Sequence, residues 1–121
     1  MVKNNYLEDI ENALKDKGDP EEVFNIILTF LNFKSVEIGI YRLLLKTSMT
    51  IKEMQERLGI SERSIRMHIK RLETEGFITK SVERGIRLKY VYRSVQIQEA
   101  WERVDQKIKN ILNEVTEAID S

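Results

Sequence analysis

Two helix signals separated by a very short connection constrain this chain more than any other feature of its sequence. The segment Thr50-Ile51-Lys52-Glu53 is a Thr-x-x-Glu capping box, which predicts the start of a helix, and Gly59 predicts its end. Only Ile60 and the capping residue Ser61 separate Gly59 from the next helix. Two short helices joined by so tight a turn must cross at a large angle, so the pattern predicts a helix-turn-helix.

The second helix of this pair, expected over residues 61–75, is apolar on one side and basic on the other. At about 100° per residue, Ile65, Ile69 and Leu72 point inward together. The opposite side is expected to carry Arg63, Arg66, Met67, Lys70 and Thr74, with Arg71 at one margin and Glu62 and Glu73 at the other.

Two extended runs follow at once, over residues 77–82 and 86–93, and Glu83-Arg84-Gly85 between them reads as a hairpin turn. The period-2 pattern predicts a core-facing set made of Ile86, Leu88, Tyr90 and Tyr92. The other face and the tip are expected to carry the cations Arg84, Arg87, Lys89 and Arg93. A helix-turn-helix followed directly by a two-stranded hairpin predicts a winged helix.

Both ends of the chain carry apolar helical patterns that one small domain cannot bury alone. Helices are expected over residues 6–17, 23–33 and 36–47, with Gly18 ending the first and Asp19-Pro20 opening the second. The second is apolar on nearly every side. From residue 95 onward, apolar residues recur in alternating steps of four and three, a heptad stripe on a helix about 36 Å long.

Self-association is the economical way to cover these surfaces, so the sequence predicts a homodimer. The expected interface residues are Phe24, Ile27, Phe30, Leu31, Ile97, Trp101, Val104, Ile108, Ile111 and Val115. The fold class is therefore expected to be mostly α with a small β-hairpin: a winged helix-turn-helix with N-terminal helices and a long C-terminal dimerisation helix. By role, residues 1–34 and 94–121 would dimerise and residues 35–93 would bind DNA.

Charge is unevenly distributed along the chain, although 20 Lys and Arg balance 20 Asp and Glu overall. Residues 57–93 hold ten Lys or Arg against four Asp or Glu, whereas residues 1–35 and 94–121 each carry a net charge of −3. A basic middle between acidic ends is expected where one face of a protein meets a polyanion.

Composition excludes several kinds of chemistry. The chain has no cysteine and one histidine, which excludes disulfides, thiolate zinc sites and imidazole-rich metal clusters. It has no glycine-rich phosphate loop and no nucleophile–base pairing, so we expect neither an enzyme nor a cofactor. No apolar run approaches the roughly 18 residues that span a bilayer, and the N-terminus is too acidic for a signal peptide. A cytoplasmic protein without membrane contact is expected.

The segment SVEIGIYRLLLKTSMTIKEMQERLGISERSIRMHIKRLETEGFI, residues 35–78, resembles the winged-helix domain of archaeal TrmB-like and bacterial MarR-like transcription regulators. Shared features are the helix ending at Leu58-Gly59, the Ser-capped recognition helix and the LETEGFI step into the wing. The resemblance covers residues 33 to about 93. TrmB-like proteins usually add a C-terminal sugar-binding domain, and this sequence stops after one helix, so sugar sensing is not expected. MarR-like proteins dimerise through helices at both ends.

The resemblance assigns DNA contacts residue by residue. Recognition-helix positions fall on Ser61, Arg63, Ser64, Arg66, Met67 and Lys70, and wing positions fall on Arg84, Arg87 and Lys89. Hydroxyls and amides at the helix start suit phosphate, arginines suit guanine edges, and Met67 suits a thymine methyl. Lys70 and Arg71, further along the helix, are expected to contact phosphates.

The function predicted is a homodimeric transcription regulator that binds double-stranded DNA sequence-specifically. Residues 61–75 would enter the major groove, and the wing, residues 77–93, would lie on the backbone or in the minor groove. The alternative is a winged-helix protein–protein interaction module of a transcription or chromatin assembly. A small-molecule effector is compatible with the phenylalanines of residues 24–33, but simple apolar packing explains them equally well.

Overall fold

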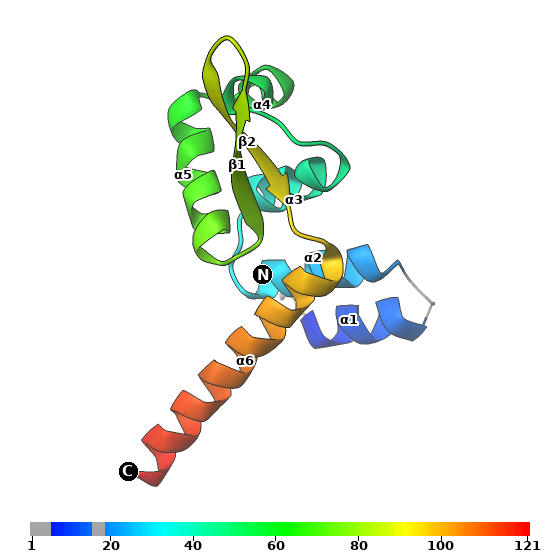
Figure 1. The fold of residues 1–121 in the computed structure, drawn as a ribbon. Helices are drawn as coiled ribbons and strands as arrows, with labels where there is room; N and C mark the ends of the chain where they lie inside the picture. The colour runs from blue at the N-terminus through cyan, green and yellow to red at the C-terminus, as the bar shows by residue number, and fades with distance from the viewer. Residues whose placement is uncertain (1–5, 16–18) are drawn as a thin grey trace. The chain divides into compact units, whose positions relative to one another are not determined.

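The computed structural model describes residues 6–15 and 19–121, which form six helices and one two-stranded antiparallel sheet (Figure 1). The elements are, in order, α1 (Tyr6–Lys15), α2 (Pro20–Phe30), α3 (Ser35–Lys46), α4 (Ile51–Leu58), α5 (Glu62–Thr74), β1 (Ile78–Arg84), β2 (Leu88–Ser94) and α6 (Ile97–Asp120). The predicted fold class is confirmed. The chain divides into two compact units, residues 1–40 and 41–121, and α3 crosses the boundary.

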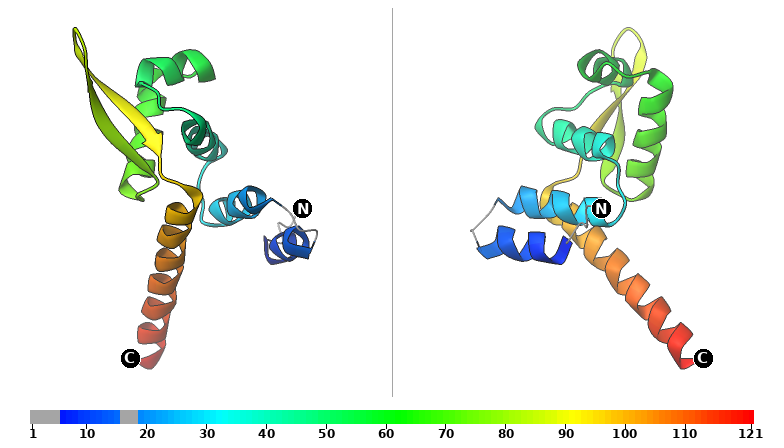
Figure 2. Two further views of the ribbon diagram at one scale, coloured as in Figure 1. Left: turned by 45° about the vertical axis from the view of Figure 1, so that its right-hand side comes forward. Right: turned by 180° about the vertical axis from the view of Figure 1, so that it is seen from behind.

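In the first unit, α1 and α2 pack side by side (Figures 1 and 2). Asp19 caps α2 by accepting a hydrogen bond from the Glu21 amide at 3.0 Å, and Pro20 occupies the first turn, as predicted. The helix ends at Phe30, three residues before the predicted end, because Asn32 adopts a left-handed conformation (φ 72°). The predicted end of the first helix, Gly18, lies outside the described residues.

The second unit contains the predicted helix-turn-helix. The Thr50 hydroxyl accepts from the Glu53 amide at 3.1 Å, and the Glu53 carboxylate accepts from the Thr50 amide at 3.0 Å, so the capping box is complete. These bonds, the one from the Thr50 amide first, lower the pKa of Glu53 below its ordinary 4.5. Gly59 ends α4 at φ 67°, and the Ser61 hydroxyl caps α5 by accepting from the Ser64 amide at 3.2 Å.

The core of this unit lies under α5. Ile65, Ile69 and Leu72 are buried as predicted, together with Tyr41, Leu44, Met54 and Phe77. Tyr41 joins α3 to the end of the hairpin: its hydroxyl donates to the Val95 carbonyl, its own carbonyl accepts from the Ser94 hydroxyl, both at 2.8 Å, and its ring meets Phe77 edge-on. Leu58, the last residue of α4, is 37% exposed because the helix ends there at the surface.

The hairpin turn lies two residues later than predicted. Arg84 pairs with Leu88, so the connection is residues 85–87 rather than 83–85. Met49 extends the sheet by a single antiparallel bridge to Tyr92, a pairing that the sequence pattern did not reveal.

Burial along the predicted core face of the wing stops much earlier than expected. Tyr92 is 6% exposed, but Tyr90, Leu88 and Ile86 are 55%, 73% and 105% exposed. The reason is that the ribbon extends beyond the helices that cover its base (Figure 2). The Lys80 ammonium lies 4.6 Å from the Tyr90 ring centroid and shields part of this surface.

The long C-terminal helix is confirmed: α6 has 24 residues. Its first half is held against the end of α5. Lys107 donates to both carboxylate oxygens of Glu75 at 3.0 Å, and a Cβ at Gly76 would lie 3.1 Å from the Arg103 Nε. Ala100 and Val104 are buried, whereas every residue from Lys109 to the end is exposed.

Candidate nucleic-acid interface

One face of α5 presents cations to solvent. Arg63, Arg66, Met67 and Lys70 are all exposed, on the side opposite the buried residues Ile65, Ile69 and Leu72. Arg63 and Lys70 make no ion pair with any residue in the described part of the chain. The helical periodicity therefore sorted the residues of α5 correctly, and these two long basic side chains have no ion-pair partner among the described residues.

Arg66 differs from its neighbours because it has an acidic partner. Its Nε and Nη2 atoms donate to one Glu62 oxygen at 3.2 and 2.9 Å. Both side chains are more than half exposed, so the pair is solvent-screened and weak. The i,i+4 spacing of Glu62 and Arg66 in the sequence is the signal for this ion pair. The sequence pattern alone predicts only that Glu62 lies at the margin of the basic face.

The two serines at the start of α5 contact each other. The hydroxyls of Ser61 and Ser64 lie 3.1 Å apart, and the Ser61 hydroxyl also satisfies the Ser64 amide. These groups therefore serve the helix cap in this structure. Arg71 is half-buried rather than fully exposed, consistent with its place at the margin of the basic face.

The wing carries cations on both of its faces. The register pairs Arg84 with Leu88 and Glu83 with Lys89, so Arg84 shares a face with Tyr90 and Lys89 lies on the other. Arg84, Arg87 and Lys89 are all exposed. The Lys89 charge also contributes to the lowered pKa of Glu53. Because β1 contacts α5, the wing and the basic helix lie next to each other (Figures 1 and 2).

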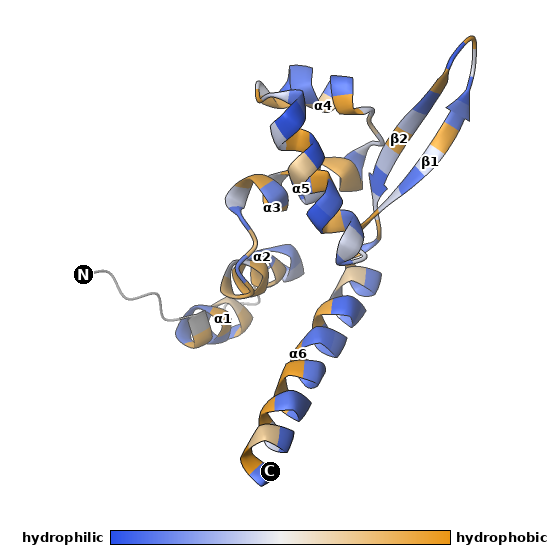
Figure 3. Ribbon diagram, turned by 90° about the vertical axis from the view of Figure 1, so that its left-hand side faces the viewer, coloured by the Kyte–Doolittle hydropathy of each residue, from blue (hydrophilic) through white to orange (hydrophobic). Residues whose placement is uncertain are grey.

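The predicted dimer residues fall into two groups. Phe24, Ile27 and Val104 are buried within the single chain, and Leu31, Ile97 and Ile108 are half-buried. The well-exposed group consists of Phe30, Trp101, Ile111 and Val115, at 57%, 44%, 45% and 49%. Leu112 and Ile119 widen the exposed apolar stripe of α6, which runs along one side of the helix (Figure 3).

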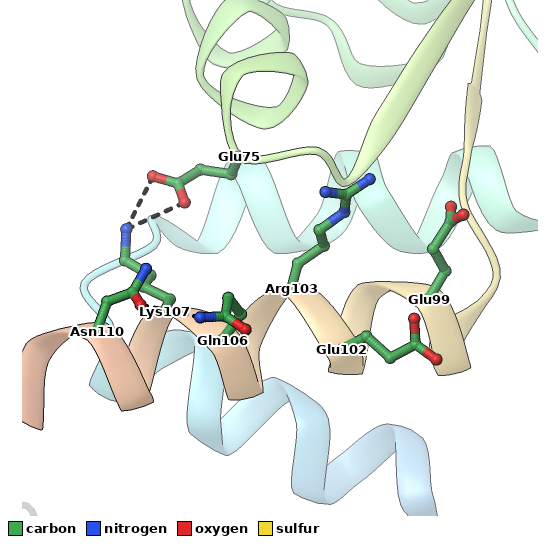
Figure 4. A pocket seen from close by; sticks show the side chains of 7 residues that line it. All are labelled: Glu75, Glu99, Glu102, Arg103, Gln106, Lys107 and Asn110. Atoms are coloured by element: carbon green, nitrogen blue, oxygen red, sulfur yellow. Dashed lines mark hydrogen bonds and ion pairs between the residues drawn. The ribbon is translucent and has the colours of Figure 1, made fainter. Parts of the chain in front are cut away.

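A polar groove of about 560 Å³ lies where α6 passes the end of α5 (Figure 4). Its lining consists of Glu75, Glu99, Glu102, Arg103, Gln106, Lys107 and Asn110. Ligand pockets are usually mostly apolar, so this groove does not strengthen the case for an effector.

The part of the chain that the structure describes offers neither a metal-binding cluster nor a membrane-spanning helix. No group of three or more His, Asp or Glu side chains converges there as metal ligands would. Among the helices of that part, none is both long and apolar enough to cross a bilayer.

Comparison with known proteins agrees with this architecture. The family described as "Sugar-specific transcriptional regulator TrmB" matches residues 28–98, more than half of the chain. No curated protein matches significantly.

Several solved structures share the fold. A protein described as a possible transcriptional regulator from Methanosarcina mazei Go1 has a TM-score of 0.66 at 10% identity, covering 82% of this chain and 87% of its own. A transcriptional regulator homologue from Pyrococcus horikoshii OT3 has a TM-score of 0.54 at 19% identity, with 93% and 98% covered. A MarR-family regulator from Enterococcus faecalis V583 has 0.53 at 16%, with 84% and 91% covered.

At these identities the structural likeness concerns the fold, while the sequence match from the end of α2 through the wing to the start of α6 identifies the family. The relatives are transcription regulators of the winged-helix type and not enzymes. The chain therefore belongs to the TrmB family of transcriptional regulators.

Proposed function

We propose that this regulator is a cytoplasmic homodimer that binds double-stranded DNA sequence-specifically, with α5 in the major groove. In this proposal the wing, residues 77–93, lies along the backbone or in the minor groove. Residues 35–93 bind DNA, and residues 1–34 and 94–121 hold the two copies together. Two copies related by a twofold axis would bind half-sites about one helical turn apart.

One observation carries the proposal: the only solvent-facing side of α5, the second helix of the helix-turn-helix, presents Arg63, Arg66 and Lys70 together. A helix of this kind fits the major groove, where an arginine can donate two hydrogen bonds to a guanine edge. In this proposal the phosphates and the adjacent minor groove are contacted by Arg71, Arg84, Arg87 and Lys89. In the complex, the hydroxyls of Ser61 and Ser64 would break their contact with each other and bind a phosphate instead. Met67 would touch a thymine methyl.

The direct test is a mobility-shift or footprinting assay on duplex fragments at several salt concentrations. Affinity is expected to fall steeply with salt, because bound cations replace the counterions of DNA. No protected site on any fragment, or an affinity independent of salt, would refute the proposal.

Arg84→Ala separates the role of the wing from that of α5. If Arg84 neutralises one phosphate, the variant binds all duplexes more weakly and the logarithmic salt slope becomes shallower by about one unit. Loss of discrimination at a single base pair would instead assign Arg84 to base reading.

A second candidate, a protein–protein interaction module, is favoured by the exposed apolar face of the wing, where Val82, Leu88 and Tyr90 are 49%, 73% and 55% exposed. Exposed apolar patches often mark protein contacts. The two functions are distinguished by the variant Arg63→Ala/Arg66→Ala. Unchanged DNA affinity together with loss of a protein partner would favour the interaction module.

A further inference from the structure

The exposed half of α6 needs a partner, and its charges indicate which one. We infer that α6 pairs with α6 of a second copy in an antiparallel sense, with Trp101 of each helix beside Ala118 of the partner subunit. This inference rests on the proposed homodimer and adds its geometry. In this register Ile108 packs against Ile111 of the partner subunit, and Val104 lies level with Val115 of the partner subunit.

The first argument is the apolar stripe. Ile111, Leu112, Val115 and Ile119 are 45–75% exposed on one side of a helix whose first half alone contacts the rest of its unit. Trp101, on the same stripe, is 44% exposed although it lies beside the winged helix. Val104, between Trp101 and Ile111, is covered within the chain, so the stripe is open at Trp101 and from Ile111 onward. Apolar residues left exposed at this spacing are the pattern of a two-helix seam.

The second argument is charge. The cations of α6, Arg103, Lys107 and Lys109, all lie within its first thirteen residues, and the rest of the helix carries Glu114, Glu117 and Asp120 without a single Lys or Arg. A parallel pair would place the two acidic ends together. An antiparallel pair places each acidic end beside residues 97–109 of the other helix, where three cations balance Glu99, Glu102 and Asp105, and so removes this repulsion.

The third argument concerns which flanks meet. Lys107 and Glu114 are seven residues apart and so lie on the same flank of the stripe. In an antiparallel pair, the same flank of the stripe on each helix meets the other. Lys107 of one copy therefore lies beside Glu114 of the partner subunit, and this contact occurs twice in the dimer. Lys107 already binds Glu75, but an ammonium has three donor hydrogens and can serve both carboxylates.

The geometry also suits the proposed DNA complex. In this register the two starts of α6 lie about 25 residues apart along the axis, or roughly 37 Å. Successive half-sites on one side of B-DNA are about 34–36 Å apart. The antiparallel pair would therefore separate the two winged helices by a distance of the size that adjacent half-sites require.

The chain has no cysteine and one tryptophan, so a single introduced cysteine can be tested both for disulfide formation and for quenching of the tryptophan. The two measurements have opposite expected results for the parallel and the antiparallel pair. In the antiparallel pair, Ala118→Cys forms no disulfide on oxidation, because the two sulfurs lie roughly 26 Å apart along the axis. A nitroxide attached to the same cysteine, however, quenches the fluorescence of Trp101 across the interface. Asn110→Cys, outside the stripe, is the control for random cross-linking.

A disulfide between the two copies of Ala118→Cys, with Trp101 unquenched, would overturn the antiparallel pairing and leave the homodimer intact. A monomer in sedimentation of the unmodified chain would refute the pairing and the dimer together. DNA binding is measured separately by mobility shift, so neither result is confused with failure of the proposed function.

A charge variant tests the same pairing without a label. Glu114→Lys places two ammonium groups beside each other in the antiparallel pair, so the dimer dissociation constant should rise about two- to fivefold. In a parallel pair the same change removes acidic repulsion and tightens the dimer. Glu117→Lys, on the outer side of the helix, is the matched control and should have a smaller effect.

Discussion

Helices α5 and α6 have the same kind of amphipathic sequence but use it differently. In α5 the apolar stripe is satisfied within the chain: Ile65, Ile69 and Leu72 are at most 2% exposed, and the basic face is left for a partner. In α6 it is the apolar stripe itself that remains exposed, with Val115 at 49% and Ile119 at 75%. Periodicity thus identifies two faces, and only packing shows which face is left to interact.

The largest expected effect comes from the same substitution made on each helix. Leu72→Ala should lower the free energy of unfolding by about 2–5 kcal/mol, because it opens a cavity in a closed core. Leu112→Ala should change it by less than about 0.5 kcal/mol at concentrations where the chain is monomeric. Urea denaturation followed by circular dichroism measures both. Equal losses in dilute solution would show that α6 is buried within the chain after all.

The next effect concerns the cations on the two helices. Arg63→Ala should weaken binding to a specific duplex by about 1–3 kcal/mol and relax discrimination at one base pair. Lys109→Ala, which removes an exposed cation of α6, should leave DNA affinity unchanged. Mobility shifts on a set of single-base variants test this. A uniform loss on every sequence would reassign Arg63 to phosphate contact.

Helix caps give a smaller contrast. Thr50→Ala should cost about 1 kcal/mol of stability because it removes the cap of α4, the helix against which α5 packs. Gln96→Ala should cost little, because the Gln96 side chain makes no capping bond at the start of α6. Thermal unfolding of the two variants compares them directly.

The Thr50–Glu53 box also has a pH dependence with a definite sign. The folded pKa of Glu53 lies below its ordinary 4.5, so its contribution is fully present above that pH and is lost as the pH falls below it. The Glu53→Gln variant should therefore be less stable than the unmodified protein at pH 6. The difference in free energy of unfolding between the two proteins should become smaller as the pH is lowered to roughly 3. A difference that stays constant over this range would exclude the charged cap.

The smallest effects come from two matched surface ion pairs, Glu62–Arg66 on α5 at 2.9 Å and Asp105–Lys109 on α6 at 3.0 Å. Glu62→Gln and Asp105→Asn should each change stability by less than about 0.5 kcal/mol. Only Glu62→Gln should tighten DNA binding, because it removes a carboxylate from the basic face and releases Arg66. Titrations at low and high salt distinguish the two; equal effects would contradict the assignment of α5 to DNA.

Features set by neighbouring residues were predictable. The caps at Thr50 and Ser61, the end of α4 at Gly59 and the inward triplet of α5 follow from hydrogen bonds and spacing within a few residues. The hairpin turn was placed two residues early, because both positions offer glycine near the turn and the difference depends on strand register. Register is fixed by contacts at the base of the wing, including the bridge between Met49 and Tyr92.

The sequence by itself determined the order of the elements, the helix-turn-helix with its hairpin and the side of α5 that carries the cations. Tertiary structure alone decided how far the core reaches: it covers Tyr92 but not Tyr90, buries Phe24 and Val104 within one chain, and joins Lys107 to Glu75. The physical reason is the separation along the sequence of the residues that determine each feature. Caps and helical faces depend on residues a turn or less apart, whereas burial depends on which distant segments cover a surface. In α6 the described segments cover Val104 but leave Ile111, Val115 and Ile119 exposed.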